Sequence, residues 1–313
     1  MTARLAGGVD ADDASTAGTG GGRWSAHDRN WAALFLLPSL LVLFGVAVYP
    51  IADAFYTSLF DLQLTRPNRV PFVWFDNYVE LMSDPSFWTA VSRTVVFTLV
   101  TVCGSVGLAL GAALLLNETF RGRRLLSAML LVPWATPSIV NGLMWKWIYD
   151  SDHGLLNGVL QRLGLIEDPI IWLADPDKAI FLLAQAAVWK QMPLAAILLL
   201  VTMKSIPDDL YRAAKVDGAN VWQRFIHVTL PSLKPGFMLV FVYETMISIR
   251  HFDLFAIMTQ GGPGDATFSL SWMIYSESFL NLRFGVGASL AFFLSIVTFA
   301  LSYLFIRFLS QKH

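Results

Sequence analysis

Four long segments of this chain contain no Asp, Glu, Lys or Arg, and they constrain its fold more than any other feature of the sequence. They occupy residues 30–52, 94–117, 125–145 and 284–306. Each holds about 20 residues or more, enough for a helix to cross the roughly 30 Å hydrocarbon core of a membrane. Water-soluble domains rarely contain uncharged stretches of this length, so we predict a membrane-spanning helix at each of them.

Two further apolar segments, at about 179–204 and 236–259, are long enough to span a membrane but contain charged residues. Only 14% of all residues are charged and 55% are hydrophobic, which is typical of a chain that lies mainly in lipid. The sequence therefore predicts an all-α integral membrane protein with six transmembrane helices. We find no internal repeat, so nothing in the sequence supports an inverted-repeat secondary transporter.

The positions of Lys and Arg predict the orientation of the chain. Most of them fall in the N-terminal tail, a short loop at 121–124, the stretch 204–234 and the tail from 307. Basic residues favour the cytoplasmic side, so we expect both termini and the stretch 204–234 to be cytoplasmic. We predict that residues 1–28, rich in Gly, Ala, Asp, Ser and Thr, form a disordered cytoplasmic tail and that residues 29–313 form the transmembrane domain.

The stretch 205–235 is unusual because it is polar and basic between two apolar segments. Pro207 with two following acidic residues is typical of a helix start. Gly218 suits a left-handed helix end, Asn220 can cap a second helix, and Pro231 is expected to end it. We predict two short amphipathic helices at the cytoplasmic surface. By composition alone, an ordinary interfacial loop that packs on its own bundle is the favoured interpretation.

A run within this stretch resembles a known motif. The spacing Ala-Ala-x-x-Asp-Gly-Ala, followed by Phe and then Leu-Pro, is similar to the "EAA" loop in permeases of binding-protein-dependent ABC importers. In that family the loop docks in a groove of a cytoplasmic ATPase and transmits motion to the membrane gate. The resemblance implies a role in ATPase coupling for these residues: Arg212, Ala213, Ala214, Asp217, Gly218, Ala219, Phe225 and Pro231. Arg212 stands where the family has the leading Glu, so no role of that Glu is carried over.

Three other segments resemble the carbohydrate importers of this family, the maltose and glycerol-3-phosphate class. They read LLPSLLVLFGVAVYPI at 36–51, PSIVNGLMWKWIYDSDHGLLN at 137–157 and FDLFAIMTQGGPGDATFSLSWMIYSESF at 252–279. The resemblance implies a type I, maltose-permease-like fold in a bacterial plasma membrane. It also implies a second homologous permease in a heterodimer, two ATPase subunits and an extracytoplasmic sugar-binding protein. It does not fix the sugar, and glycerol-3-phosphate or a glycerophosphodiester is the alternative substrate.

The sequence gives no sign of catalysis by this chain. It has no Gly-x-x-x-x-Gly-Lys-Ser/Thr sequence, so we expect ATP and Mg to bind to the partner ATPase subunits and no cofactor to bind here. The five His residues are scattered, so we expect no metal site. The net charge of −1 does not indicate a nucleic acid partner, and membrane lipid is the expected surrounding. A proton-coupled carrier is the less favoured alternative.

Several polar, charged or aromatic residues lie in or near the predicted spans, where ionisable groups usually face the interior or a water-filled route. They are Asn141, Gln185, Trp189, Lys190, Glu244, Arg250 and Asp253. A rise of about 1.5 Å per residue along continuous helices places Lys190, Arg250 and Asp253 at similar depth. They could form an ion-pair cluster that joins the spans. Alternatively, with the other residues, they could line a sugar route of mixed aromatic and hydrogen-bonding groups.

Overall fold

The computed structural model describes residues 26–310 of the chain, with side chains over 35–307. Within this part every regular element is helical, and extended pairing is limited to two isolated bridges. This confirms the predicted all-α class. The predicted disordered tail, residues 1–28, lies almost wholly outside the described residues. The chain divides into two compact units, Met1–Ala52 and Asp53–His313, which are described separately.

The first unit supplies most of one membrane-spanning helix. It contains α1 (Ala26–Leu43), the π-helical turn η1 (Phe44–Val48) and the start of α2 (Tyr49–Ser58). The helical stretch Phe35–Ser58 is long and apolar enough to cross a membrane. Its side chains over residues 35–52 are all exposed, as expected for a helix whose surface faces lipid or another subunit. The prediction of a span at 30–52 is confirmed.

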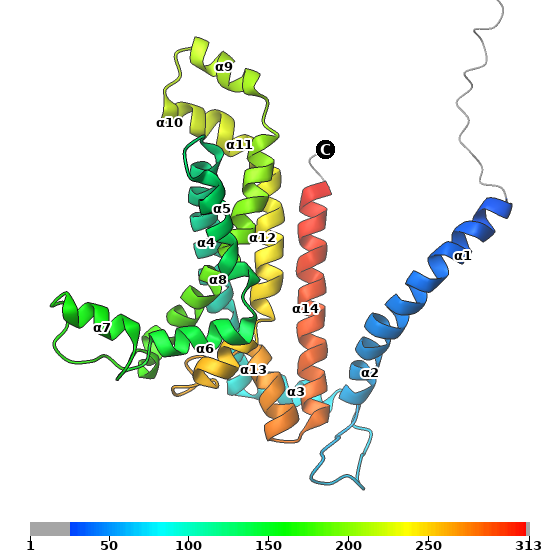
Figure 1. The fold of residues 1–313 in the computed structure, drawn as a ribbon. Helices are drawn as coiled ribbons and strands as arrows, with labels where there is room; N and C mark the ends of the chain where they lie inside the picture. Colours follow the sequence, from blue (N-terminus) through cyan, green and yellow to red (C-terminus); the bar gives the residue numbers. More distant parts are fainter. Residues whose placement is uncertain (1–25, 311–313) are drawn as a thin grey trace, which may run out of the picture. The chain divides into compact units, whose positions relative to one another are not determined.

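Three long helices of the second unit also qualify as membrane spans: α4 (Pro85–Asn117), α8 (Pro176–Lys204) and α14 (Phe284–Ser310). Figure 1 shows α4 and α8 running together along the bundle. Both begin with an Asp cap followed by proline, a strong start signal. The side chain of Asp84 accepts from the N–H of Ser86 at 2.8 Å. Because of this cap, α4 starts well before the charge-free run at 94.

The predicted span at 125–145 is not a straight helix. It consists of α5 (Arg123–Ala135) and α6 (Ser138–Ile148), which meet at an angle of 98°. The break lies at Thr136, whose backbone is extended (φ −70°, ψ 131°). A residue that precedes a proline is disfavoured in helical conformation, and Pro137 follows here. A charge-free run measures length only, so it could not show this bend.

The predicted span at 236–259 also needs correction. Its helix, α12 (Lys234–Ile249), ends ten residues early, and Arg250 is its C-terminal cap (φ −105°). Asp253 therefore lies on a different segment, and the depth count along a continuous helix does not hold for it. The helix that precedes α12, Val221–Ser232, meets it at an angle of 61°. Among the described residues, four helices are thus long and apolar enough to span a membrane, or up to six when each bent pair counts as one span.

Small residues bring α4 and α8 close together. Ala109 and Ala113 of α4 and Ala195 and Ala196 of α8 are fully buried in one apolar core. A second core gathers around Phe97, Leu183 and Phe255. Lipid provides no hydrophobic drive for helix association, so close backbone approach and van der Waals packing hold such helices together. Together the two cores make α4 and α8 the central pair of the bundle.

The shorter elements connect these helices. They are α3 (Asp76–Ser83), α7 (Leu155–Arg162), η2 (Trp172–Ala174), α9 (Asp208–Val216), α10 (Val221–Arg224), η3 (Phe225–Thr229), α11 (Leu230–Ser232), η4 (Phe255–Thr259), α13 (Leu270–Tyr275) and η5 (Ser276–Leu280). In Figure 1, α3 and α13 lie at one end of the bundle and α9 with α10 at the other. The bundle therefore presents two ends with different structures.

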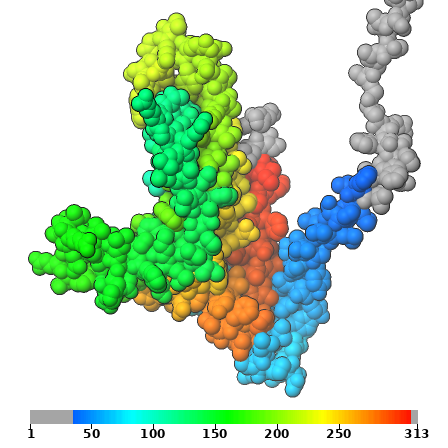
Figure 2. All heavy atoms as spheres, in the orientation of Figure 1, coloured from blue at the N-terminus to red at the C-terminus, as the bar shows by residue number. Residues whose placement is uncertain are grey.

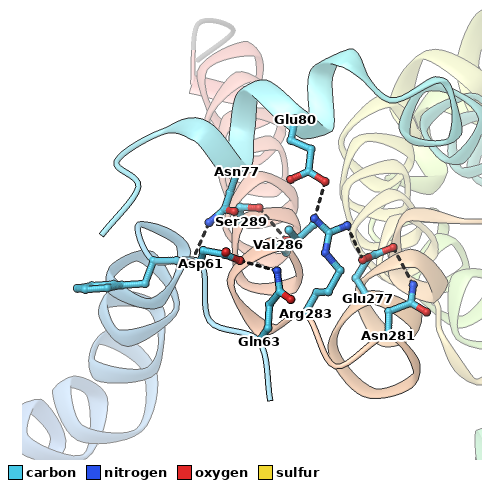
Figure 3. Close-up of polar contacts among 10 residues, drawn as sticks. Asp61, Gln63, Asn77, Glu80, Glu277, Asn281, Arg283, Val286 and Ser289 are labelled. Atoms are coloured by element: carbon cyan, nitrogen blue, oxygen red, sulfur yellow. Dashed lines mark hydrogen bonds and ion pairs between the residues drawn. The ribbon is translucent and has the colours of Figure 1, made fainter. Parts of the chain in front are cut away.

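Polar contacts hold together the end formed by α3 and α13 (Figure 3). Arg283 forms ion pairs with Glu80 of α3 and, at 3.5 Å, with Glu277 of η5. The Nδ2 of Asn77 donates to the carbonyls of Ser58 and Phe60 at 2.7 and 3.0 Å. These bonds tie segments that are far apart in sequence, so this end is a folded cap.

Candidate functional site

A helix hairpin, residues 205–235, stands at the end of the bundle opposite this cap (Figures 1 and 2). Its first helix, α9, carries acidic residues in its first turn, where the helix dipole favours negative charge. Gly218 follows with φ +79°, in the left-handed region. The N–H groups of Gly218 and Ala219 donate to the carbonyls of Lys215 and Ala214 at 3.1 and 2.9 Å. The predicted left-handed turn is confirmed.

The second half of the hairpin starts with a capping box. The side chain of Asn220 accepts from the N–H of Gln223 at 2.8 Å, and the side chain of Gln223 accepts from the N–H of Asn220 at 2.9 Å. Two N–H groups that the helix leaves free are thereby satisfied. The predicted cap at Asn220 is confirmed.

The prediction that Pro231 ends this second helix holds to within one residue, because α10, η3 and α11 form one continuous helix that ends at Ser232. Pro231 has no N–H to continue the helical hydrogen bonding. The turn before it, η3, widens into a π-helix, in which the N–H of Leu230 donates to the carbonyl of Phe225. The chain bends only at Leu233, which is fully buried against the bundle. Packing of Leu233, two residues later, coincides with the end of the helix.

The hairpin exposes large apolar side chains. Val216, Val221 and Trp222 are 88%, 74% and 67% exposed. The hydroxyls of Tyr211 and Thr229 lie 3.0 Å apart and join the two halves, so the hairpin is held in shape while these side chains stay uncovered. A hollow of about 360 Å³ opens at its turn, lined by Ala214, Asp217, Gly218, Ala219, Gln223, Arg224, His227 and Val228. An exposed apolar patch beside a hollow is typical of a protein-binding surface.

Arg212, the residue that departs from the motif, faces outward from α9. Its guanidinium lies 3.0 Å from the carboxylate of Asp209, one turn earlier on the same helix, and both side chains are largely exposed. An exposed pair of this kind contributes only about 0.3–0.5 kcal/mol. Both charges are therefore accessible to a partner.

Lys190 has a defined place in the bundle. From the middle of α8, its Nζ donates to the carbonyls of Trp134 (3.3 Å) and Thr136 at the break between α5 and α6. Carbonyls at a helix end have no N–H partner within their own helix, and a cation there is favoured by the helix dipole. No ion pair among the described residues involves Lys190, Arg250 or Asp253. The expected ion-pair cluster is therefore absent from this part of the chain.

Two more of the predicted route residues lie beside Lys190. Asn141 of α6 is fully buried, and its Nδ2 donates to the carbonyl of Ala186 at 3.2 Å. The Oδ1 of Asn141 has no partner among the described residues. The ring of Trp189 faces that of Trp145 edge-on at 6.1 Å. Asn141, Trp189 and Lys190 thus gather where α6 crosses α8.

The remaining predicted route residues are not part of this group. Gln185 is exposed on α8. Arg250 is exposed at the end of α12, and its Nε donates to the carbonyl of Met246 at 3.1 Å. Asp253 is half-buried. Glu244, by contrast, is fully buried inside the bundle.

Three exposed side chains, Asp150, Asp152 and His153, place ligand atoms within 4.8 Å of one another. The scattered His residues had predicted no metal site. The Oδ1 of Asp150 already accepts from the N–H groups of Asp152 and His153 at 3.0 and 2.9 Å. These two backbone hydrogen bonds hold the pKa of Asp150 below its ordinary value. These bonds are those of an Asx turn, in which an Asp side chain accepts hydrogen bonds from backbone N–H groups two or three residues later.

Comparison with known proteins decides the family. Residues 104–312 match the family described as "binding-protein-dependent transport system inner membrane component". This match covers more than half of the chain and includes the hairpin. The chain belongs to this family.

Relatives of the permease are similar to it over nearly their whole length. The sulfoquinovosyl glycerol transport system permease protein of Agrobacterium fabrum is 38% identical, over 90% of this chain and 89% of the relative. The trehalose/maltose transport system permease protein of Thermococcus litoralis is 37% identical, over 87% of this chain and 91% of the relative. A crystal structure of a bacterial ABC transporter that imports alginate contains a chain with a TM-score of 0.78 and 19% identity, covering 92% of the permease and 98% of that chain. These matches confirm the importer-permease fold.

Sequence reasoning missed two side chains that hold α6 in place. The Nζ of Lys146 donates to the carbonyl of Ile257 in η4 at 3.1 Å. Trp145 packs between Tyr149 and Trp189, and its Nε1 has no partner among the described residues. The sequence signal for Lys146 was its position directly after the charge-free run 125–145. A buried tryptophan N–H without a hydrogen-bond partner is uncommon. It adds an available donor where α6 crosses α8.

Proposed function

We propose that the permease imports a sugar or a small glycoside into the cytoplasm as the membrane subunit of an ATP-driven importer. The observation that carries this proposal is the near full-length similarity to two permeases. One is named for sulfoquinovosyl glycerol and the other for trehalose and maltose. Both names describe sugar-containing molecules of similar size. Neither relative supports glycerol-3-phosphate over a glycoside.

The hairpin is the proposed docking site for a cytoplasmic ATPase. Support comes from its shape: a capped, bonded pair of helices presents exposed Val216, Val221 and Trp222 beside a hollow at Gly218. Such a surface fits a groove on another protein. The residues proposed to make this contact are those that carry the motif, from Arg212 to Ala219 with Phe225 and Pro231. ATP and Mg would be bound and used by that partner.

The other proposed partners follow from the family. They are a second homologous permease, a second ATPase subunit and an extracytoplasmic binding protein that delivers the sugar. A related crystal structure contains an alginate ABC transporter with a periplasmic protein bound to an alginate pentasaccharide. In the proposed complex, the hairpin and both termini of this chain are cytoplasmic. The cap around Arg283 then faces outward.

The crossing of α6 and α8 is the proposed contact for the passing sugar. Asn141 has an unused carbonyl oxygen and Trp145 an unused N–H, and Trp189 adds an aromatic face. Sugars bind to walls that combine aromatic faces with hydrogen-bonding groups. Gln185, Arg250 and Asp253 are proposed as outer parts of the same route.

The test of the function is uptake by a strain that lacks the gene for this chain. We expect uptake of one glycoside from a panel containing trehalose, maltose and sulfoquinovosyl glycerol to be lost and then restored by the intact gene. Glycerol-3-phosphate and an amino acid serve as controls. Loss of uptake of glycerol-3-phosphate alone, or of no panel member, would contradict the proposal.

A further inference from the structure

A layer of buried polar side chains lies between the two apolar cores of the bundle, where α4, α8 and α12 meet. Residues at three- and four-residue spacing share one face of a helix, and α4 contributes such a row of hydroxyls. The side chains of Thr101, Ser105 and Glu244 are fully buried. The layer consists of Thr98, Thr101 and Ser105 of α4, Gln191 of α8, and Glu244 and Ser248 of α12.

Most of these polar atoms lack a hydrogen-bond partner among the described residues. This holds for the hydroxyls of Thr98, Thr101 and Ser105 and for both carboxyl oxygens of Glu244. The hydroxyl of Ser105 on α4 lies near the Glu244 carboxyl on α12. Thr94, one turn before this row, differs because its hydroxyl donates to the carbonyl of Ala90 at 2.8 Å. Buried polar groups without partners are rare, so this layer needs an explanation.

Among the described residues, Glu244 forms no ion pair with a cation of any helix packed on α12. On α4 the nearest charged residues are Arg93 and Glu118, at opposite ends of the charge-free run, and Cys103 is exposed. On α8 the nearest is Lys190, whose Nζ is bonded to backbone carbonyls at the break between α5 and α6. The helix α14 has no charged residue from 284 to 306, and α11 has none.

The remaining ionisable groups are on α12 and directly after it. His251, in the segment after α12, is buried, and its Nδ1 has no partner among the described residues. Tyr243 is the direct neighbour of Glu244, and Lys234 and Arg250 mark the two ends of the helix. No ion pair among the described residues includes Glu244. An ionised carboxylate at this position would be buried in a membrane bundle without a counter-ion, which is very costly.

A neutral carboxyl group fits the site because it has both an O–H donor and a C=O acceptor. We propose that Glu244 is a proton-binding site, a neutral acid that donates a hydrogen bond to Ser105 and so holds α12 against α4. The ligand is a proton, and the role of Glu244 is to position two helices rather than to contact the transported molecule. This inference is independent of which molecule the permease imports.

Infrared difference spectroscopy tests the protonation state directly. The full chain, purified with its bound subunits, is placed in lipid vesicles at about pH 7, where an exposed glutamate is ionised. The C=O band of a protonated carboxyl group should be present in the wild type and lost in Glu244→Gln. Ser105→Ala should shift this band to higher frequency because the hydrogen bond is lost. Glu118→Gln, at the exposed end of α4, should leave it unchanged.

Thermal unfolding provides the second test. Gln is uncharged and has nearly the shape of a protonated Glu, so Glu244→Gln should assemble and unfold like the wild type. Glu244→Ala should unfold at a lower temperature, since it leaves an empty space and an unpartnered hydroxyl. An unchanged carboxyl band in Glu244→Gln would overturn the proposal. So would failure of Glu244→Gln to assemble, because the site would then require an anion.

Discussion

Lys190 on α8 donates a hydrogen bond to the carbonyl of Thr136, which lies 54 residues away at the break between α5 and α6. The same Nζ also donates to the carbonyl of Trp134 at 3.3 Å. One side chain therefore satisfies two backbone groups that the break leaves free. This contact gives Lys190 a structural role that a count of charges along the sequence did not indicate.

The first prediction concerns this contact. Lys190→Met should lower the melting temperature of the purified protein, because two carbonyls lose a charged donor. A hydrogen bond to a charged group contributes about 1.5–3 kcal/mol. Asp253→Asn should leave the melting temperature unchanged, since no ion pair of Asp253 is found among the described residues. Equal losses in both variants would show instead that the two residues form an ion pair in the membrane.

A second prediction concerns the turn at Gly218. Its φ of +79° suits glycine, and a Cβ there would meet no atom within 4 Å, so the cost of a substitution is in the backbone alone. That cost is about 1–3 kcal/mol for a residue forced into this region. Gly218→Val should still insert into the membrane but retain less ATPase during purification.

Gly218→Asn is the matched control because Asn tolerates the left-handed conformation better than Val. We expect it to retain more ATPase than Gly218→Val. The measurement is the ratio of ATPase to permease in the purified complex. An unchanged ratio in Gly218→Val would mean that this turn does not determine docking.

A third prediction concerns pH at the start of α8. The side chain of Asp175 lies 2.6 Å from Lys178 and also caps the helix by accepting from the N–H of Asp177 at 3.0 Å. The hydrogen bond from Lys178, followed by the backbone bonds, holds the pKa of Asp175 below its ordinary value of 3.8. A lowered carboxyl pKa contributes stability that is present above 3.8 and is lost as the pH falls through the lower folded value.

Hydrogen exchange of the first-turn amides of α8 measures this effect. In the wild type, protection of the Asp177 amide should decrease as the pH falls below 3.8, after correction for intrinsic exchange. Asp175→Asn retains a capping oxygen but cannot titrate, so its protection should be smaller and independent of pH in this range. The same pH dependence in both proteins would assign the effect to another group.

A fourth prediction concerns orientation. Reporters fused after His313 or inserted within 117–124 should be cytoplasmic, and a reporter within 150–178 should be outside. The reason is the bias of Lys and Arg toward the cytoplasmic side. An outside position for residues 207–234 would contradict both the orientation and the docking role of the hairpin.

Local signals in the sequence predicted the hairpin well. The left-handed turn needs only Gly218, and the capping box needs only Asn220 and Gln223, so each is set by neighbouring residues. The end of the second helix, Ser232, lies one residue after the predicted Pro231. It also coincides with the burial of Leu233 against the bundle, which is a tertiary contact.

Of the six predicted spans, four are found as single helices and the other two as bent helix pairs. Uncharged length shows that a segment can lie in a membrane, but it says nothing about a bend such as the one at Thr136. Pro137 was the local signal for that bend. The spacing of Thr98, Thr101 and Ser105 places their hydroxyls on one face of α4. That Glu244 lies near this row follows only from the packing of α12 on α4.

We propose that the permease moves its substrate only with an ATPase docked on the hairpin. The most direct test is uptake of the identified glycoside into vesicles that contain the permease, its partner subunits and the binding protein. We predict uptake when both ATP and the ATPase are present. We predict no uptake when the ATPase is omitted or when ATP is replaced by a non-hydrolysable analogue. Uptake by this chain alone, driven by a proton gradient without ATP, would contradict the account.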